Sequence, residues 1–337
     1  YILQKDLEDF EAALAEYCNV EYVIGVANGT DAIWLSLMAA GVGSGDEVIV
    51  PSHTYVASPA SIKFVGAQPI LVECGYDNMM DPNNIVQAIT NKTKAIMPVQ
   101  LNGRTCNMDE IGIIAKEHNL LIIEDAAQGL GSLFNGKMAG TFGLAGTYSF
   151  YPAKVLGCYG DGGAVMTNEK LLAEKIMLLR DHGRDENGEF KTWGFNSRLD
   201  NLQAAILLEK LKTFDQDIIR RRAIAEIYNN EIINGENIKL PPGPTTDGPY
   251  FDTFQNYELR ALKRNELKEF LFKNGVGTII QWGGKAIHQE KNLGLTHFNL
   301  PYTDKFFKEC LMLPMNTSLT DAEAIYIANK INDFYVR

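Results

Sequence analysis

Lys154 is the residue whose surroundings most suggest covalent chemistry. It ends the segment Ser149-Phe-Tyr-Pro-Ala-Lys154, and Gly160-Asp-Gly-Gly163 follows, where glycines let the backbone pass close to a ligand. A lysine becomes a nucleophile near neutral pH only when burial or a neighbouring cation lowers the pKa of its amine. An apolar, glycine-rich turn can provide that burial, and the amine could then form a Schiff base. Judged alone, the residue could also be a surface lysine in a loop.

Asp125 is the acidic residue placed to act with such a lysine. It ends the apolar run 120–125, so we expect it at the carboxyl end of a buried parallel strand, where open α/β sheets bind ligands. A carboxylate there either caps the next helix or faces a ligand. Facing a pyridine cofactor, it would keep a proton on the ring nitrogen and make the ring an electron sink. Gln128 could hydrogen-bond the 3-hydroxyl of the same ring.

A phosphate site is predicted between the first strand and the helix after it. Gly29 and Thr30 follow Asn28 there, and free backbone N–H groups at a helix start can hold an anion. The hydroxyl of Ser149 could reach the same phosphate, although an Asn-Gly pair is also common in ordinary turns. Tyr55 follows another strand and could stack on a planar ring or fill a gap under a loop.

The elements that position these residues alternate between strands and helices. Strands are predicted at residues 22–26, 47–50, 69–72, 95–99 and 120–123. Helices are predicted at residues 5–18, 32–40, 57–65 and 109–118. Thr30 or Asp31 is expected to cap the second helix. This alternation is typical of a mostly parallel sheet covered on both faces, so we predict an α/β fold with a large cofactor-binding domain over residues 1–205.

Residues 206–337 are predicted to form a connector helix and a small α+β domain. The helical pattern itself runs over residues 201–234, and we expect its basic run 220–222 on an exposed face. A proline-rich loop follows at 241–249. Beyond it we predict a strand at 256–260, a helix at 265–274, a strand at 277–282 and a last helix at 321–335.

Composition and charge narrow the class of protein. The 337 residues are 46% hydrophobic and 22% charged, as in an ordinary globular protein of about two domains. The net charge of −11 and the lack of a Lys/Arg cluster argue against nucleic acid as a partner. Five cysteines without a Cys-x-x-Cys pair suggest no disulfide framework and no metal site, and no apolar run is long enough for a membrane. We therefore expect a cytoplasmic protein, with residues missing before Tyr1.

Five segments in this order make the sequence resemble the DegT/DnrJ/EryC1/StrS family of sugar aminotransferases, which are fold-type I pyridoxal-phosphate enzymes. They are Ala27-Asn-Gly-Thr-Asp-Ala32, Val50-Pro-Ser-His-Thr-Tyr55, Ile123-Glu-Asp-Ala-Ala-Gln128, Ser149–Lys154 with Gly160–Gly163, and Gly194-Phe-Asn-Ser-Arg198 before Gln203-Ala-Ala. The resemblance covers nearly the whole chain. It implies a large α/β/α domain, a smaller α+β C-terminal domain, and a homodimer whose active site lies at the interface.

The resemblance also implies roles for individual residues. Lys154 would form the Schiff base with pyridoxal 5'-phosphate, Asp125 would pair with the pyridinium nitrogen, and Tyr55 would stack on the ring. The remaining cofactor contacts would be Gly29, Thr30, Gln128, Ser149 and, from the other subunit, Asn196 with Arg198 beside it. Substrate contacts would come from Tyr159, Arg198, Gln281, Trp282, Lys285 and His288. Some relatives have histidine at the lysine position and act as dehydratases, so the lysine here favours transamination.

Two segments depart from the family pattern. Many relatives have His-Tyr-Pro where this chain has Gln281-Trp282-Gly-Gly-Lys285, and His-Leu-Tyr-Gly where it has Gln100-Leu-Asn-Gly103. Both are expected on the substrate side of the site. Lys285 is a candidate to bind the substrate diphosphate, and Trp282 or His288 the sugar or base, with a packed tryptophan and a core histidine as the alternatives.

The reaction implied by the resemblance moves an amino group from L-glutamate to the C-3 or C-4 ketone of a nucleotide-linked keto-deoxysugar. The product would be an amino sugar for surface polysaccharides or natural-product glycans. A keto-cyclitol acceptor and a non-catalytic regulatory protein that binds pyridoxal phosphate are alternatives. A nucleotide-binding oxidoreductase ranks last, because no Gly-x-Gly-x-x-Gly lies between the first strand and its helix.

Overall fold

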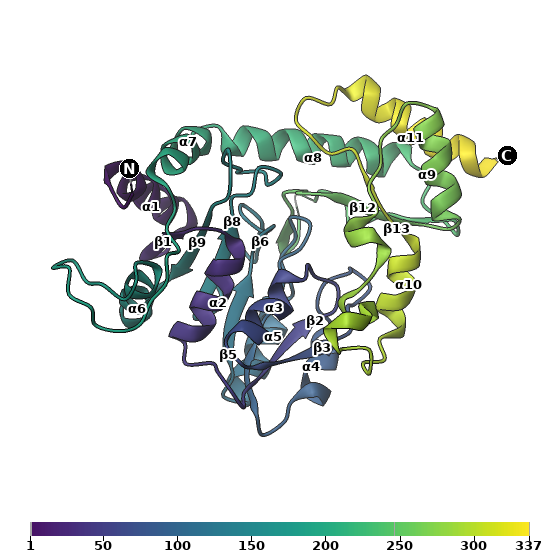
Figure 1. Ribbon diagram of the computed structural model, residues 1–337. Helices are drawn as coiled ribbons and strands as arrows, with labels where there is room; N and C mark the ends of the chain where they lie inside the picture. Colours follow the sequence, from purple (N-terminus) through teal and green to yellow (C-terminus); the bar gives the residue numbers. More distant parts are fainter. Residues whose placement is uncertain (1, 246, 337) are drawn as a thin grey trace.

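A seven-stranded sheet forms the centre of the computed structural model, which describes residues 2–245 and 247–336 (Figure 1). The strand order is β1-β9-β8-β5-β4-β2-β3. The strands are β1 (Tyr22–Val26), β2 (Glu47–Pro51), β3 (Gln68–Val72), β4 (Thr93–Ile96), β5 (Leu121–Asp125), β8 (Ala145–Ser149) and β9 (Gly163–Thr167). Only β9 runs against the other six, because both of its pairings, with β1 and β8, are antiparallel. The predicted mostly parallel sheet is therefore confirmed.

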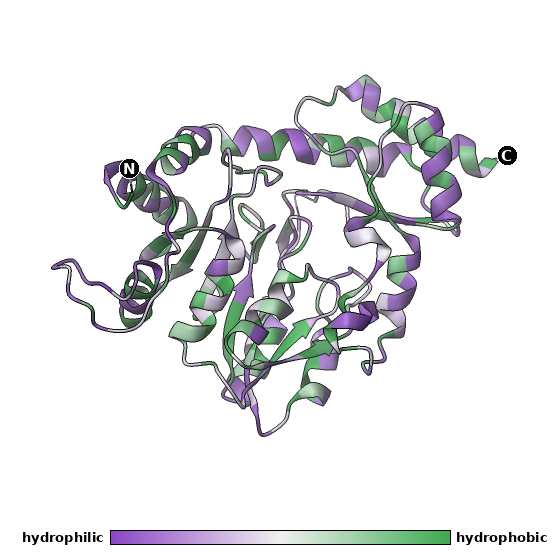
Figure 2. Cartoon of the chain, in the orientation of Figure 1, coloured by the Kyte–Doolittle hydropathy of each residue, from purple (hydrophilic) through white to green (hydrophobic). Residues whose placement is uncertain are grey.

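Helices cover this sheet and bury its apolar strands (Figure 2). They are α1 (Lys5–Cys18), α2 (Gly29–Ala39), α3 (Ala57–Phe64), α4 (Pro82–Ala88), α5 (Met108–Glu117) and α6 (Lys170–Arg180). The prediction that Thr30 or Asp31 caps α2 is wrong. Asn28 is the cap, and its Oδ1 accepts a hydrogen bond from the Asp31 N–H at 2.8 Å. The helix thus begins at Gly29, which places the N–H groups of Gly29 and Thr30 in its open first turn.

The predicted long connector is two helices, α7 (Asn201–Leu211) and α8 (Phe214–Glu231). The chain turns at residues 212–213 because α7 packs on α1, whereas α8 crosses to the C-terminal part and packs on α11 (Asp321–Val336) (Figure 1). The basic run on α8 is half-buried, not exposed as predicted. Arg220 pairs with Asp321 at 2.6 Å, and Arg221 and Arg222 donate hydrogen bonds to backbone carbonyls.

The C-terminal part is built on a small antiparallel sheet of β10 (Ile238–Lys239), β12 (Tyr257–Ala261) and β13 (Cys310–Leu313). Helices α9 (Arg264–Lys273), α10 (Pro301–Glu309) and α11 surround it. Residues 277–282, all of which the structure describes, do not form the predicted strand. Only Ile279 bridges to Met312, and the 3₁₀ turn η1 (Gln281–Gly284) follows, because the positive φ angles of Trp282 and Gly283 cannot continue a strand.

A third, small sheet joins the two parts of the chain. It consists of β11 (Tyr250–Phe251), β6 (Leu133–Phe134) and β7 (Lys137–Met138), and β11 pairs with β6. Residues 250–256 therefore lie against the N-terminal part, although the sequence pattern assigns them to the C-terminal one. The division into domains 1–205 and 206–337 stays a prediction. None of the helices described here has the length and apolarity needed to cross a membrane.

Candidate active site

A cavity of about 720 Å³ lies at the carboxyl ends of β5 and β8 and at the start of α2. The predicted site residues that line it are Gly29, Thr30, Tyr55, Asp125, Gln128, Ser149, Lys154 and Trp282. The structure thus brings together all seven cofactor contacts that were predicted from within one chain. They meet because the strands that precede them end at the same edge of the sheet.

Asp125 is the last residue of β5 and only 5% of its surface is exposed. Burial raises the pKa of its carboxyl group, while hydrogen bonds from Ser58 and the Ala127 N–H oppose this effect. The Ser58 hydroxyl donates to Oδ2 at 2.6 Å, and the Ala127 N–H to Oδ1 at 3.1 Å. The charge of Lys154 also opposes the effect of burial, and a protonated ring nitrogen beside this carboxylate would add a second positive charge.

Lys154 lies in the turn after β8, where its N–H bonds the Tyr151 carbonyl at 2.8 Å. Burial lowers the pKa of its amine, and the charge of Asp125 opposes this shift. A larger share of the amine is therefore uncharged near neutral pH than for a lysine in water, as a nucleophile requires.

A close backbone contact forms the anion-binding corner of the cavity. A Cβ on Gly29 would lie 2.7 Å from the Ser149 Cβ, and a Cβ on Gly163 would lie 2.4 Å from the Asn28 carbonyl carbon. Both positions therefore require glycine. The first-turn N–H groups of α2 and the Ser149 hydroxyl make up a donor set that suits a phosphate. These residues fit pyridoxal phosphate, because the cavity offers an amine, an acid and an anion site together.

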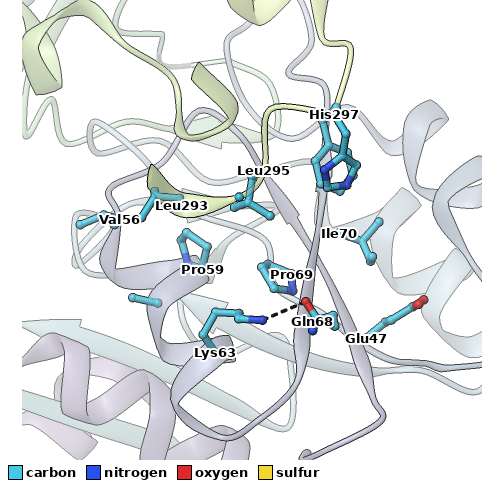
Figure 3. Close-up of a pocket in the computed structure, with 13 residues that line it drawn as sticks. Glu47, Val56, Pro59, Lys63, Gln68, Pro69, Ile70, Leu293, Leu295 and His297 are labelled. Atoms are coloured by element: carbon cyan, nitrogen blue, oxygen red, sulfur yellow. Dashed lines mark hydrogen bonds between the residues drawn. The ribbon is translucent and has the colours of Figure 1, made fainter. Parts of the chain in front are cut away.

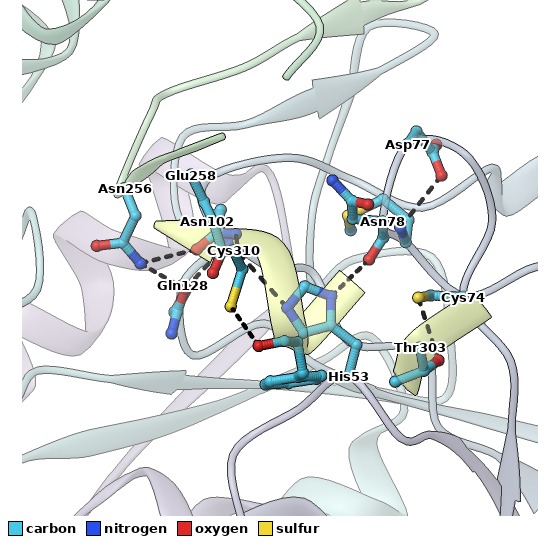
Figure 4. Close-up of polar contacts among 12 residues, drawn as sticks. His53, Cys74, Asp77, Asn78, Asn102, Gln128, Asn256, Glu258, Thr303 and Cys310 are labelled. Carbon is cyan, nitrogen blue, oxygen red and sulfur yellow. Dashed lines mark hydrogen bonds and ion pairs between the residues drawn. The ribbon is translucent and has the colours of Figure 1, made fainter. Parts of the chain in front are cut away.

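Gln128 is held in one orientation by neighbours from two other segments (Figure 4). Its Oε1 accepts hydrogen bonds from the Asn102 N–H at 2.9 Å and the Asn256 Nδ2 at 3.3 Å. A backbone N–H can only donate, so the amide oxygen must face Asn102 and the NH₂ group is left to donate into the cavity. This donor matches the oxygen at the 3-position of a pyridoxal ring.

Glu258 of β12 holds Asn102, one of the two residues that orient Gln128 (Figure 4). Its carboxylate accepts a hydrogen bond from Asn102 Nδ2 at 2.8 Å and lies 3.5 Å from Nε2 of buried His53. Burial lowers the pKa of His53, but interactions with Cys74 and Glu258 outweigh it and raise the pKa to about 10. The Gln281 side chain also faces Glu258, and with its nitrogen turned inward it donates to both oxygens. Gln281 is thus a core residue behind the cavity wall.

Other predicted substrate residues lie outside this cavity. Lys285 is exposed and 3.8 Å from Glu290, and His288 is buried between Ser52 at 2.7 Å and Asp304 at 2.9 Å. His288 therefore has the contacts of the core alternative.

Three more of the predicted site residues, from the glycine-rich segment and from residues 194–198, also lie outside the cavity. Tyr159 is 75% exposed, Asn196 is exposed, and Arg198 pairs with Asp181 at 2.8 Å. Their predicted roles stay predictions.

The cavity also contains residues that were not predicted from the sequence. Thr54, Tyr151 and Asp161 line it, and Ser58 supports Asp125 from α3. Gln100 and Leu101 also line it, and they belong to the segment that was expected on the substrate side. Asp161 could have been found, since it stands inside the Gly160–Gly163 motif. Ser58 could not, because nothing in its spacing connects it to a strand end 67 residues later.

A second cavity, of about 410 Å³, lies between α3 and residues 293–298 (Figure 3). Its walls are largely apolar, and the amine of Lys63 is bonded to Gln68 Oε1 at 3.0 Å. None of the predicted site residues lines it.

Comparison with known proteins identifies the family to which this chain belongs. Residues 1–332 match the DegT/DnrJ/EryC1/StrS aminotransferase family, so the chain belongs to this family of aminotransferases. The predicted family, enzyme class and pyridoxal phosphate cofactor are confirmed.

Particular relatives cover almost the whole chain. A "pleiotropic regulatory protein" of Geobacillus stearothermophilus is 40% identical over 99% of this chain and 91% of its own. The dTDP-3-amino-3,4,6-trideoxy-alpha-D-glucose transaminase of Streptomyces venezuelae is 37% identical over 100% and 89%. The crystal structure of S. venezuelae DesV in complex with a ketimine intermediate has a TM-score of 0.95 at 36% identity, covering 100% of this chain and 91% of DesV. The predicted fold class is therefore confirmed.

Proposed function

We propose that this protein transfers an amino group from L-glutamate to the C-3 or C-4 ketone of a nucleotide-linked keto-deoxysugar. The observation that carries the proposal is the enclosed amine of Lys154 beside buried Asp125 in one cavity with an anion site. The relatives that are named as transaminases of nucleotide-linked sugars support the choice of acceptor.

The chain's own groups have distinct tasks in this reaction. When bound, pyridoxal phosphate supplies an electron sink for the negative charge that develops at the reacting carbon. Lys154 would hold the cofactor through its Nζ, and as a free amine beside the substrate it would accept and return a substrate proton as a general base. Asp125 would stabilise a proton on the ring nitrogen. Gln128 would donate to the ring oxygen, and Tyr55 would pack on the ring.

The phosphate would be held by Gly29, Thr30 and Ser149, whose donors converge at the start of α2. We further propose a homodimer in which Asn196 of the partner subunit completes this corner. Trp282 faces the same cavity from the C-terminal part and is the candidate wall for the sugar.

Two measurements test the proposal. Borohydride treatment of the protein with pyridoxal phosphate should label Lys154, and the Lys154→Ala variant should lack both the label and turnover. Glutamate with thymidine-, uridine- and guanosine-linked keto-sugars should then give an aminated product by mass spectrometry. Full turnover in the variant would refute the role of Lys154.

A regulatory protein without catalysis is the second candidate, because one relative at 40% identity carries a regulatory name. The complete set of Lys154, Asp125 and Ser149 in one cavity counts against it. The two functions separate in a single experiment. Glutamate should convert bound pyridoxal phosphate to the pyridoxamine form in an enzyme, and failure of this conversion would favour the regulatory function.

A further inference from the structure

Gln255 lies behind the turn that carries Lys154, although it follows that turn by about a hundred residues. Its side chain makes two hydrogen bonds there. Oε1 accepts from the Val155 N–H at 2.9 Å, and Nε2 donates to the Ala153 carbonyl at 2.9 Å. One amide thus contacts the residues on both sides of Lys154.

Buried Phe150, whose N–H bonds the Gly162 carbonyl at 2.8 Å, precedes the Lys154 turn, but the three residues between Phe150 and Lys154 have few restraints. Tyr151, Pro152 and Ala153 are exposed, so side-chain packing does not fix them. The local hydrogen bond from Lys154 N to Tyr151 O closes the turn but does not attach it to the rest of the protein. Gln255 supplies that attachment from a different segment.

Gln255 itself is held firmly. It is 8% exposed, and Arg221 of α8 donates to its carbonyl at 3.1 Å and to that of Phe254 at 3.2 Å. Two residues earlier, the Thr253 N–H bonds the Gly103 carbonyl at 2.8 Å. A Cβ on Gly103 would lie 2.6 Å from the Gln255 nitrogen, so the two backbones are in direct contact. The backbone of Gln255 is therefore held by α8 and by residues 100–104.

We propose that Gln255 is a positioning residue that holds the Lys154 backbone so that the amine faces Asp125. This inference rests on the proposed function of Lys154. An uncharged amide suits the task, since it offers a donor and an acceptor at once. A carboxylate would lose the bond to Ala153 and would raise the pKa of the Lys154 amine through its charge.

The test uses the full chain without cofactor and then with pyridoxal phosphate. In Gln255→Leu, hydrogen exchange of the Val155 amide should rise roughly tenfold, because a single bond protects it. Capture of pyridoxal phosphate by Lys154, followed by absorbance, should slow by roughly tenfold or more. Gln255→Glu keeps the acceptor, so Val155 should stay protected while the pH at which capture is half-maximal moves upward.

Gln203→Leu is the matched control. Gln203 makes the same pair of hydrogen bonds with the backbone of Tyr159, at 2.8 and 3.1 Å, in the same glycine-rich loop. Its loss should leave Val155 exchange and cofactor capture at wild-type rates. Unchanged exchange in Gln255→Leu, or equal changes in both leucine variants, would overturn the proposal. Exchange in the cofactor-free protein does not depend on any substrate, so this failure is distinct from a failure of the proposed transamination.

Discussion

Asp125→Asn should separate what the buried acid does for catalysis from what it does to stability. Because burial raises the pKa of Asp125 above its unfolded value, the cofactor-free folded protein binds the proton more tightly than the unfolded chain. The free energy of unfolding should then fall as the pH rises from about 4 through the raised pKa. Asparagine has nearly the same shape and no charge, so it should remove this loss.

The size follows from the surroundings of the carboxylate. Two hydrogen bonds, from Ser58 and Ala127, offset part of the burial cost, so we expect cofactor-free Asp125→Asn to be more stable than wild type at pH 8 by about 1 kcal/mol, the scale of one buried polar interaction, and no more stable at pH 4. Turnover should fall by roughly 100-fold or more, since the charge that stabilises the protonated ring nitrogen is gone.

Urea unfolding at both pH values and steady-state kinetics measure the two effects. Asp161→Asn is the control, because Asp161 is an exposed acid that lines the same cavity. It should leave the pH dependence of stability unchanged. If Asp125→Asn is no more stable than wild type at pH 8, the buried carboxylate is not under electrostatic strain and the reasoning is wrong.

Further perturbations test other parts of the site. Gly29→Ala should weaken pyridoxal phosphate binding roughly tenfold in a fluorescence titration, because its Cβ would meet that of Ser149 at 2.7 Å; unchanged affinity would contradict the close contact. Ser58→Ala removes a 2.6 Å hydrogen bond that lowers the pKa of Asp125, so it should move the acidic limb of the pH–rate profile to higher pH; an unmoved limb would rule out this support. Lys154→Arg should lose turnover despite its retained charge, and activity above a few per cent would exclude a Schiff base.

Much of the cofactor site could be predicted because it depends on local sequence. The run that ends at Asp125 is buried and apolar, and the carboxyl end of a parallel strand faces the ligand edge whatever follows it. Gly29 likewise lies between a strand and a helix that were both predicted, although the helix begins three residues earlier than expected. Strand β8, which ends at Ser149, was not predicted.

The missed features depend on contacts between distant segments. Gln281 looked like a substrate contact, but Glu258 draws it into the core. Arg221 looked like part of a solvated face, but the carbonyls of Phe254 and Gln255 surround it. The predicted strand at 277–282 is reduced to one bridge between Ile279 and Met312, and the left-handed backbone at Trp282 ends the extended segment. Local periodicity contains no information on such partners.

The glycine contact between β9 and the start of α2 has an evolutionary consequence. Gly163 leaves no room for a side chain against Asn28, so the backbone itself fixes the phosphate corner relative to the sheet. The opposite wall, around Trp282, belongs to a 3₁₀ turn outside any sheet. If Trp282 contacts the acceptor as proposed, mutation can remodel that wall while Lys154 and Asp125 keep their places, so that one scaffold can diversify into many sugar specificities.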